Sequence, residues 1–160
     1  MLIGGTLDGA RCKTQVDIGF GDAITPGPVQ ADYPTLIDDL PAPRLRTYPI
    51  YSVVSEKFHA MALHGMTNSR LKDYFDLHVI FSRESLNPKT LAQAVNATFA
   101  RRGMDAPMTL PVGLTDEFAT DPTRQSMWTA FLRKNDLAAI PLIEVVANLR
   151  SEFEKILALT

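Results

Sequence analysis

The sequence contains a single cysteine, Cys12, and no long run of apolar residues. One cysteine excludes an intrachain disulfide framework and a multi-cysteine zinc site, and this scarcity is typical of a reducing compartment. No run approaches the roughly 20 apolar residues that span a bilayer, and the first residues lack the basic and then apolar pattern of a signal peptide. We therefore expect a cytoplasmic protein with no membrane partner.

Neither sign of charge dominates the chain. The formal net charge is −2 and there is no block of lysine or arginine, so the overall field does not indicate nucleic-acid binding. The hydrophobic fraction of 46% and the charged fraction of 21%, with 11 prolines and 9 glycines, exclude a disordered, collagen-like or coiled-coil chain. A length of 160 residues corresponds to one folded domain or to half of a larger one.

The first fifty residues have the pattern of β-structure. Asp8-Gly9 suits the positive φ angles of a tight hairpin turn, and a second strand is expected over residues 11–20. In that strand Cys12 lies on the apolar face, which predicts a buried core thiol, whereas Asp17 lies on the polar face. Residues 25–43 are rich in proline and aspartate and predict one long loop, followed by a short strand within residues 44–51.

The remainder of the chain predicts five helices. Ser52 is expected to cap the first, and Asn68 or Ser69 the second. Asn87-Pro88 predicts a capped start for the third, which ends near Arg101 and Gly103. The last two are expected over residues 123–134 and 141–159, the final one with an apolar stripe at Leu142, Val145, Val146, Leu149, Phe153 and Ile156. The predicted class is α+β, with a β-rich domain over residues 1–51 and a helical domain over residues 52–160.

Lys57 is a charged residue within an apolar helix face. At about 100° per residue, Val53, Val54, Phe58 and Met61 span an arc of about 140° that includes Lys57. One explanation is that the lysine stem lies on the core while its ammonium reaches water. The other is a cleft in which the ammonium meets phosphate or carboxylates, because an unpaired buried charge is costly.

Asp73 and Asp76 share one side of the next helix. A carboxylate pair there could bind a metal or orient a hydroxyl. The alternative is an ordinary ion pair of Lys72 with Asp76 at i,i+4. Asp17 is a candidate metal ligand at the rim of a site.

Other polar positions are less informative. His59 and His64 are five residues apart, which does not match a helical zinc pair, so both are expected at the surface. Arg101 and Arg102 end a helix, where cations suit the helix dipole, and a surface role is expected for them as well.

Three blocks, in order, resemble one family. They are DIGFGD, YPIYSVVSEKFHAMALHG and NSRLKDYFDL, and later stretches such as NATFARRGMDAP extend the likeness over most of residues 11–155. On these residues the chain resembles the AbiEii-type (AbiEii/AbiGii) nucleotidyltransferase toxins, in particular the C-terminal portion of that family.

The resemblance implies part of a polymerase-β-like nucleotidyltransferase sheet followed by a helical bundle. It implies a toxin of a toxin–antitoxin or phage-abortive system that transfers nucleotide from a nucleoside triphosphate, with Mg²⁺, to an acceptor such as tRNA or other RNA. It also implies an antitoxin protein as partner. Lys57 matches the family's conserved lysine, which would contact the triphosphate, and Asp73 or Asp76 matches a later acidic motif. Asp17 matches an acidic position after the family's metal-binding motif.

The chain departs from the family pattern at one place. Members carry an upstream Asp-x-Asp that holds the catalytic metals, and no Asp-x-Asp occurs here. We therefore expect the chain to correspond to the latter half of the enzyme, completed by a missing N-terminal half. The alternative is a catalytically inactive remnant that binds only an antitoxin or a nucleotide.

Overall fold

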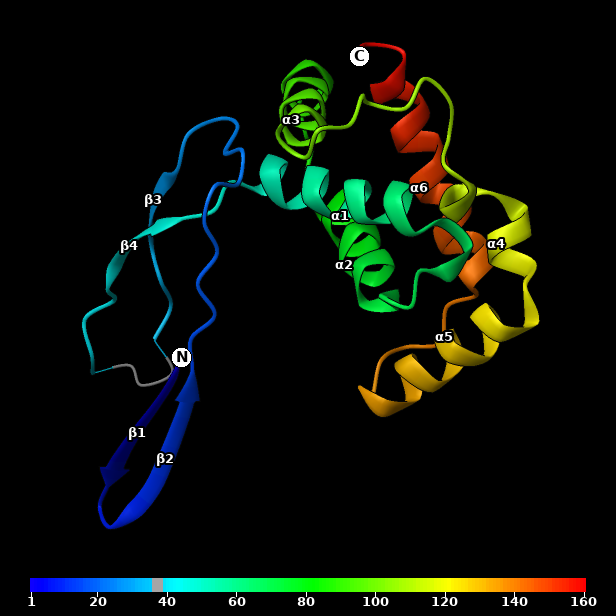
Figure 1. Ribbon diagram of the computed structural model, residues 1–160. Helices are drawn as coiled ribbons and strands as arrows, with labels where there is room; N and C mark the ends of the chain where they lie inside the picture. The colour runs from blue at the N-terminus through cyan, green and yellow to red at the C-terminus, as the bar shows by residue number, and fades with distance from the viewer. Residues whose placement is uncertain (36–38) are drawn as a thin grey trace.

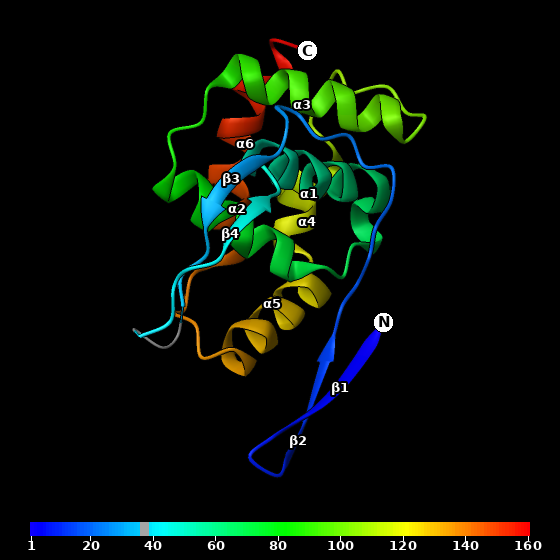
Figure 2. The same cartoon turned by 90° about the vertical axis from the view of Figure 1, so that its left-hand side faces the viewer.

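The computed structural model describes residues 1–35 and 39–160 and has the α+β class that the sequence predicts. The strands come first and the helices follow, as Figure 1 shows. In both Figure 1 and Figure 2 the first hairpin extends away from the helices, which pack together at the other end of the molecule.

The predicted hairpin at Asp8-Gly9 is confirmed. Strand β1 (Leu2–Leu7) pairs antiparallel with β2 (Ala10–Gln15), and the two turn residues have φ angles of 49° and 79°. Positive φ at both central positions matches the right-handed twist of the strands, which explains the choice of Asp and Gly. The second strand is shorter than predicted, since it ends at Gln15 instead of continuing to residue 20.

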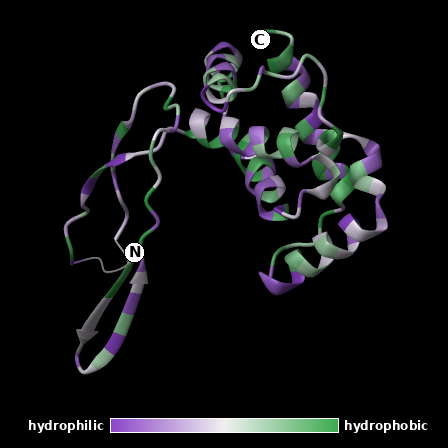
Figure 3. Cartoon of the chain, in the orientation of Figure 1, coloured by the Kyte–Doolittle hydropathy of each residue, from purple (hydrophilic) through white to green (hydrophobic). Residues whose placement is uncertain are grey.

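The prediction of a buried thiol at Cys12 is wrong, because this side chain is exposed. Hydrophilic and hydrophobic residues do alternate along β2 (Figure 3), but the ribbon has only two strands and its apolar side is not buried. Phe20, which was expected on the same apolar face, is 91% exposed. Alternation therefore predicted the strand correctly and the burial wrongly.

The single loop predicted over residues 25–43 is wrong for part of its length. Strand β3 (Val29–Asp32) lies within it and pairs antiparallel with β4 (Arg44–Thr47). The strand is only four residues long and follows prolines, so its local sequence resembles a loop, and it is the pairing with β4 that defines it. The part of the prediction that falls on residues 36–38 lies outside the described residues.

The first two helices carry the candidate residues Lys57, Asp73 and Asp76. Helix α1 (Ile50–His64) has Pro49 at its N-cap, three residues before the predicted cap Ser52, and Gly65 at its C-cap, with a φ of 47°. The Ser52 hydroxyl is therefore not a cap. It exchanges hydrogen bonds with the backbone N–H and carbonyl of Thr25, at 2.9 and 3.1 Å.

A short 3-10 turn, η1 (Gly65–Thr67), leads to α2 (Leu71–Arg83). Neither Asn68 nor Ser69 is the N-cap of α2, since Arg70 holds that position. Asn68 Oδ1 instead accepts from the backbone N–H of Arg70 at 2.9 Å, which fixes the turn just before the helix.

The later helices largely follow the prediction. Helix α3 (Pro88–Arg101) has the expected cap, in which Asn87 Oδ1 accepts from the N–H of Thr90 at 3.1 Å. The structure adds the short elements η2 (Val112–Leu114) and α4 (Asp116–Thr120), which the sequence analysis did not predict. Helices α5 (Pro122–Lys134) and α6 (Leu142–Leu157) complete the chain.

The hydrophobic core of the described residues lies among the helices, between Val54 and Ile156. All six residues of the predicted stripe on α6 are buried. Phe58 of α1 stacks on Phe153 of α6 with ring centroids 4.1 Å apart, so the first helix is packed against the last. The division into domains at residue 51 stays a prediction. Within residues 1–35 and 39–160 no helix is long and apolar enough to cross a bilayer.

Candidate functional site

Lys57 lies between α1 and α2 with its side chain 17% exposed. Its Nζ is 2.6 Å from Asp73 Oδ1 and 2.7 Å from Asp76 Oδ2, so it donates to both carboxylates. The apolar arc that contained Lys57 thus turns toward α2, where two acidic side chains receive the ammonium. The structure brings together the three residues that the sequence had placed on two separate helices.

Two further cations complete this group. Arg70 Nε donates to Asp73 Oδ2 at 2.8 Å, and Lys72 Nζ donates to Asp76 Oδ2 at 2.7 Å. The i,i+4 ion pair of Lys72 with Asp76, which the sequence analysis gave as the alternative to a functional carboxylate pair, is therefore present. Asp76 also binds Lys57. We call these five residues the Lys57 cluster. Three cations and two carboxylates leave it with one positive charge in excess.

The cluster holds Lys57 and Asp76 in their charged forms. Burial alone would lower the pKa of Lys57, but the hydrogen bonds to Asp73 and Asp76 outweigh it and raise the pKa. Burial would raise the pKa of Asp76, but the hydrogen bonds from Lys57 and Lys72 outweigh it and lower the pKa. An ammonium has three N–H donors, and Lys57 uses two of them on these carboxylates. One donor is left for a further partner.

A cleft of about 520 Å³ opens beside Lys57. Its walls come from five parts of the chain: the loop after β2, the segment before α1, one side of α1, the start of α2 and the end of α3. The polar residues that line it are Asp22, Tyr48, Glu56, Lys57, His59, His64, Arg70, Asp73 and Arg102.

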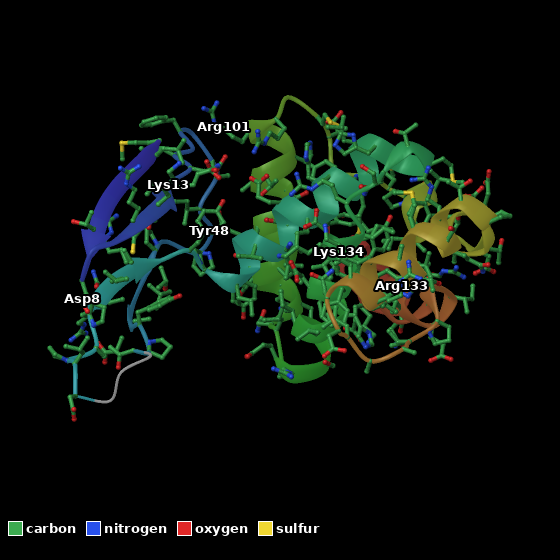
Figure 4. All side chains as sticks on the ribbon, turned by 90° about the horizontal axis from the view of Figure 1, so that it is seen from below. Asp8, Lys13, Tyr48, Arg101, Arg133 and Lys134 are labelled. Carbon is green, nitrogen blue, oxygen red and sulfur yellow. The ribbon has the colours of Figure 1, made fainter. Side chains whose placement is uncertain are left out.

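Arg102 connects the N-terminal segment to the helices at one wall of the cleft. It donates to Asp22 Oδ1 at 3.2 Å and to Glu56 Oε2 at 3.0 Å. Its neighbour Arg101 donates to the Gly21 carbonyl, and Figure 4 places Arg101 where the loop after β2 meets the end of α3. Both arginines are exposed, as predicted, but their contacts with residues 80 positions away could not be read from the sequence.

Among the residues that line the cleft, His59 has a burial that the sequence analysis predicted wrongly. It was expected at the surface with His64, but it is only 7% exposed, whereas His64 is exposed as predicted. Its ring meets Phe99 of α3 edge-on, with centroids 5.0 Å apart. Its position, one turn from Glu56 and two residues after Lys57, was the available signal for a place in the site. The sequence analysis compared only the spacing of His59 and His64 with that of a zinc pair.

Asp17, the candidate metal ligand, is exposed just beyond β2 and accepts a hydrogen bond from Gln15 Nε2 at 2.8 Å. It does not line the cleft. A role for it in metal binding stays a prediction.

A divalent metal requires several ligand atoms that are free to bind it, such as carboxylate oxygens. Cations engage three of the four carboxylate oxygens of the Lys57 cluster, namely both oxygens of Asp73 and Oδ2 of Asp76, so these oxygens are not presented to a metal. Among residues 1–35 and 39–160, no three His, Cys, Asp or Glu side chains are grouped as metal ligands. The described residues therefore do not fit a metal centre, and we derive no metal-dependent step from them.

Comparison with known proteins identifies the family to which the chain belongs. The sequence pattern of the family described as "Nucleotidyl transferase AbiEii toxin, Type IV TA system" matches residues 2–158. No curated protein and no solved structure matches the chain significantly. The family is one of nucleotidyltransferases, which generally use a nucleoside triphosphate and a divalent metal, and its type IV toxin–antitoxin systems include an antitoxin. Because the match covers nearly the whole sequence, the chain belongs to the AbiEii nucleotidyltransferase toxin family.

Proposed function

We propose that the cleft beside Lys57 binds the nucleoside triphosphate of a nucleotidyl transfer reaction. The observation that carries this proposal is the position of Lys57, whose ammonium is held by Asp73 and Asp76 in the wall of the cleft and keeps one N–H donor for a ligand. Arg70 and Arg102 line the same cleft, so an anionic ligand meets three cations there. Each cation is already paired with one or more of the carboxylates of Asp22, Glu56, Asp73 and Asp76. Charge-assisted hydrogen bonds of this kind are the strong contacts to phosphate oxygens.

In this proposal Lys57 contacts the triphosphate, while Asp73 and Asp76 are positioning residues. Asp73 has a side chain only 4% exposed, and both of its oxygens accept from cations, so this carboxylate holds Lys57 and Arg70 and does not bind the ligand itself. Two carboxylates also keep the ammonium charged, as the raised pKa of Lys57 indicates. Fixed charge at the site of a transferring phosphoryl group is the main contribution that proteins make to such reactions.

The finer parts of the function are proposals as well. We propose RNA as the acceptor, with tRNA as the first substrate to test, Mg²⁺ as the metal that accompanies the triphosphate, and the cytoplasm as the compartment. Since the described residues do not fit a metal centre, no residue is assigned to Mg²⁺ beyond the prediction for Asp17.

A second function has an observation in its favour. Because cations engage three of the four carboxylate oxygens of the Lys57 cluster and leave it with one positive charge in excess, the cluster is suited to binding an anion. The chain would then be a catalytically inactive protein that binds a nucleotide or an antitoxin.

A transfer assay separates the two functions. The full chain is incubated with Mg²⁺, total tRNA and each of four nucleoside triphosphates labelled at the α-phosphate, and label on the RNA is counted. Transfer that is lost in Lys57→Gln and kept in Lys72→Gln supports the enzyme. Binding of the triphosphate without any transfer supports the binding-only protein. Absence of both contradicts the enzyme and the nucleotide-binding protein, and leaves the antitoxin as the ligand of the second function.

A further inference from the structure

Two buried side-chain atoms in the wall of the cleft have no hydrogen-bond partner among the described residues. They are Glu56 Oε1 and His59 Nε2. The two residues are three positions apart on α1 and therefore share one side of the helix. Native proteins pair nearly all such atoms, because an unsatisfied polar group loses its water without compensation. Two of them side by side in a cleft indicate a missing partner.

His59 offers a neutral hydrogen-bonding group at this place. The residue is more than nine-tenths buried and lines the cleft. Burial lowers the pKa of His59, and Arg102 and His64 act in the same direction, while only Glu56 opposes them. A neutral imidazole has one N–H donor and one acceptor nitrogen, so Nε2 can meet an uncharged polar group of a ligand.

Glu56 restricts that ligand further. Its Oε2 accepts from Arg102 at 3.0 Å, which leaves Oε1 as a free acceptor. A carboxylate cannot donate, so the partner of Oε1 must be a hydroxyl or an N–H group. An inorganic polyphosphate carries few such donors near neutral pH and is repelled by the carboxylate.

Tyr48 supplies a third feature of the same cleft. The residue is 40% exposed, and it lies where the strand region joins the helices, as Figure 4 shows. Burial raises the pKa of Tyr48, and Asp22 and Glu56 raise it further, so the phenol stays neutral. An exposed aromatic face suits the stacking of a nucleobase.

We propose that Glu56 and His59 bind the nucleoside part of the nucleotide, through a hydroxyl or amino group that donates to Glu56 Oε1 and pairs with His59 Nε2. This inference rests on the proposed function, in which Lys57 meets the triphosphate of the same ligand. The pair makes the cleft select a nucleotide over a bare polyphosphate. The donor group is either a ribose hydroxyl or a base amine, which share this chemistry.

Calorimetric titration of the full chain tests the pair. The probes are ATP, GTP, CTP, UTP and inorganic tripolyphosphate. Glu56→Gln and His59→Gln are expected to weaken the best-bound nucleotide about tenfold or more, the loss expected for a hydrogen bond with a buried or charged group. Neither variant is expected to weaken tripolyphosphate, since Glu56→Gln removes a carboxylate that repels it. Two control variants remove neighbours without touching the orphan atoms: His64→Gln on the same cleft wall, and Asp22→Asn, which removes the other carboxylate bound to Arg102.

The outcomes separate this inference from the proposed function. Equal affinity for nucleotides and tripolyphosphate, or equal losses for both in the two variants, overturns the nucleoside role while Lys57-dependent binding still stands. Binding that does not depend on Lys57 overturns both. Titration with the 2′-deoxy and 3′-deoxy forms of the best nucleotide, and with inosine triphosphate, then distinguishes a ribose hydroxyl from a base amine as the donor.

A second measurement needs no variant. The chain has three histidines, so their imidazole signals can be followed by NMR as ligand is added. The nucleotide is expected to shift the His59 signal and tripolyphosphate to leave it in place, with His78, which does not line this cleft, as the internal reference. A His59 signal that does not move at saturating nucleotide overturns the proposal.

Discussion

Lys57 and Asp73 join α1 to α2 across 16 residues of sequence, with Nζ 2.6 Å from Oδ1. The side chain of Asp73 is only 4% exposed, and Arg70 takes its second oxygen at 2.8 Å. Both oxygens of this carboxylate therefore accept hydrogen bonds from cations. Its place in the protein is to hold Lys57 at the cleft, which makes it a structural residue and a positioning residue at once.

Asp73→Asn is expected to destabilise the fold. An amide keeps the shape of the side chain, but it puts an N–H group against a cation and leaves a part-buried ammonium with one carboxylate fewer. We expect the free energy of unfolding to fall by about 2 to 3 kcal/mol, measured by urea denaturation.

Asp76→Asn is the matched comparison. Its side chain is 26% exposed and one of its two cations, Lys72, is 73% exposed, so water replaces part of what is lost. We expect the smaller loss for Asp76→Asn. Equal losses would mean that burial does not set the strength of these pairs.

Asp76 also predicts a dependence on pH. Although burial opposes it, the hydrogen bonds from Lys57 and Lys72 lower the pKa of this carboxyl below the ordinary value of 3.8. A lowered carboxyl pKa stabilises the fold above the ordinary value, and the stabilisation is lost as pH falls through the folded-state pKa. The difference in unfolding free energy between the wild type and Asp76→Asn should thus shrink as pH is lowered from about 7 to about 3. A difference that stays constant over this range would contradict the ion pairing.

Gly113 predicts a packing effect in the core beside the site. A Cβ atom built on this residue would lie 2.8 Å from Tyr74 Oη and 3.2 Å from the Met61 carbonyl. The Tyr74 hydroxyl donates to the Gly113 carbonyl at 2.9 Å and is buried, so it cannot simply move aside. Gly113→Ala should lower the unfolding free energy by about 1 to 3 kcal/mol. Gly4→Ala, which has open space around its Cβ position, is the control and should change stability little by comparison.

The sequence predicted the features whose signal is local. The Asn87-Pro88 start of α3 and the apolar stripe of α6 depend on residues within a few turns of each other, and both are confirmed. Strand β3 and the burial of His59 depend on what packs against them from elsewhere in the chain, and both were predicted wrongly. Cys12 shows the same limit, because alternation along a strand does not say whether a second layer covers it.

The candidate site likewise has features that the local sequence predicted and features that depend on packing between distant segments. The helical period alone marked Lys57 as a charge on an apolar face and put Asp73 and Asp76 on one side of their helix. That the three meet depends on how α1 and α2 pack, which periodicity does not specify. Glu56 and Arg102 were separated by 46 positions, and no local pattern could have joined them at the cleft wall.

The most direct test of the central claim is the affinity of Lys57→Gln for nucleoside triphosphates, measured by calorimetry beside the wild type and Lys72→Gln. Lys72 binds the same carboxylate as Lys57 but is 73% exposed and does not line the cleft, so it is a matched control. Thermal melting of all three proteins checks that they are folded. We predict that Lys57→Gln weakens binding at least tenfold while Lys72→Gln leaves it nearly unchanged. A folded Lys57→Gln protein that binds as tightly as the wild type would contradict the account.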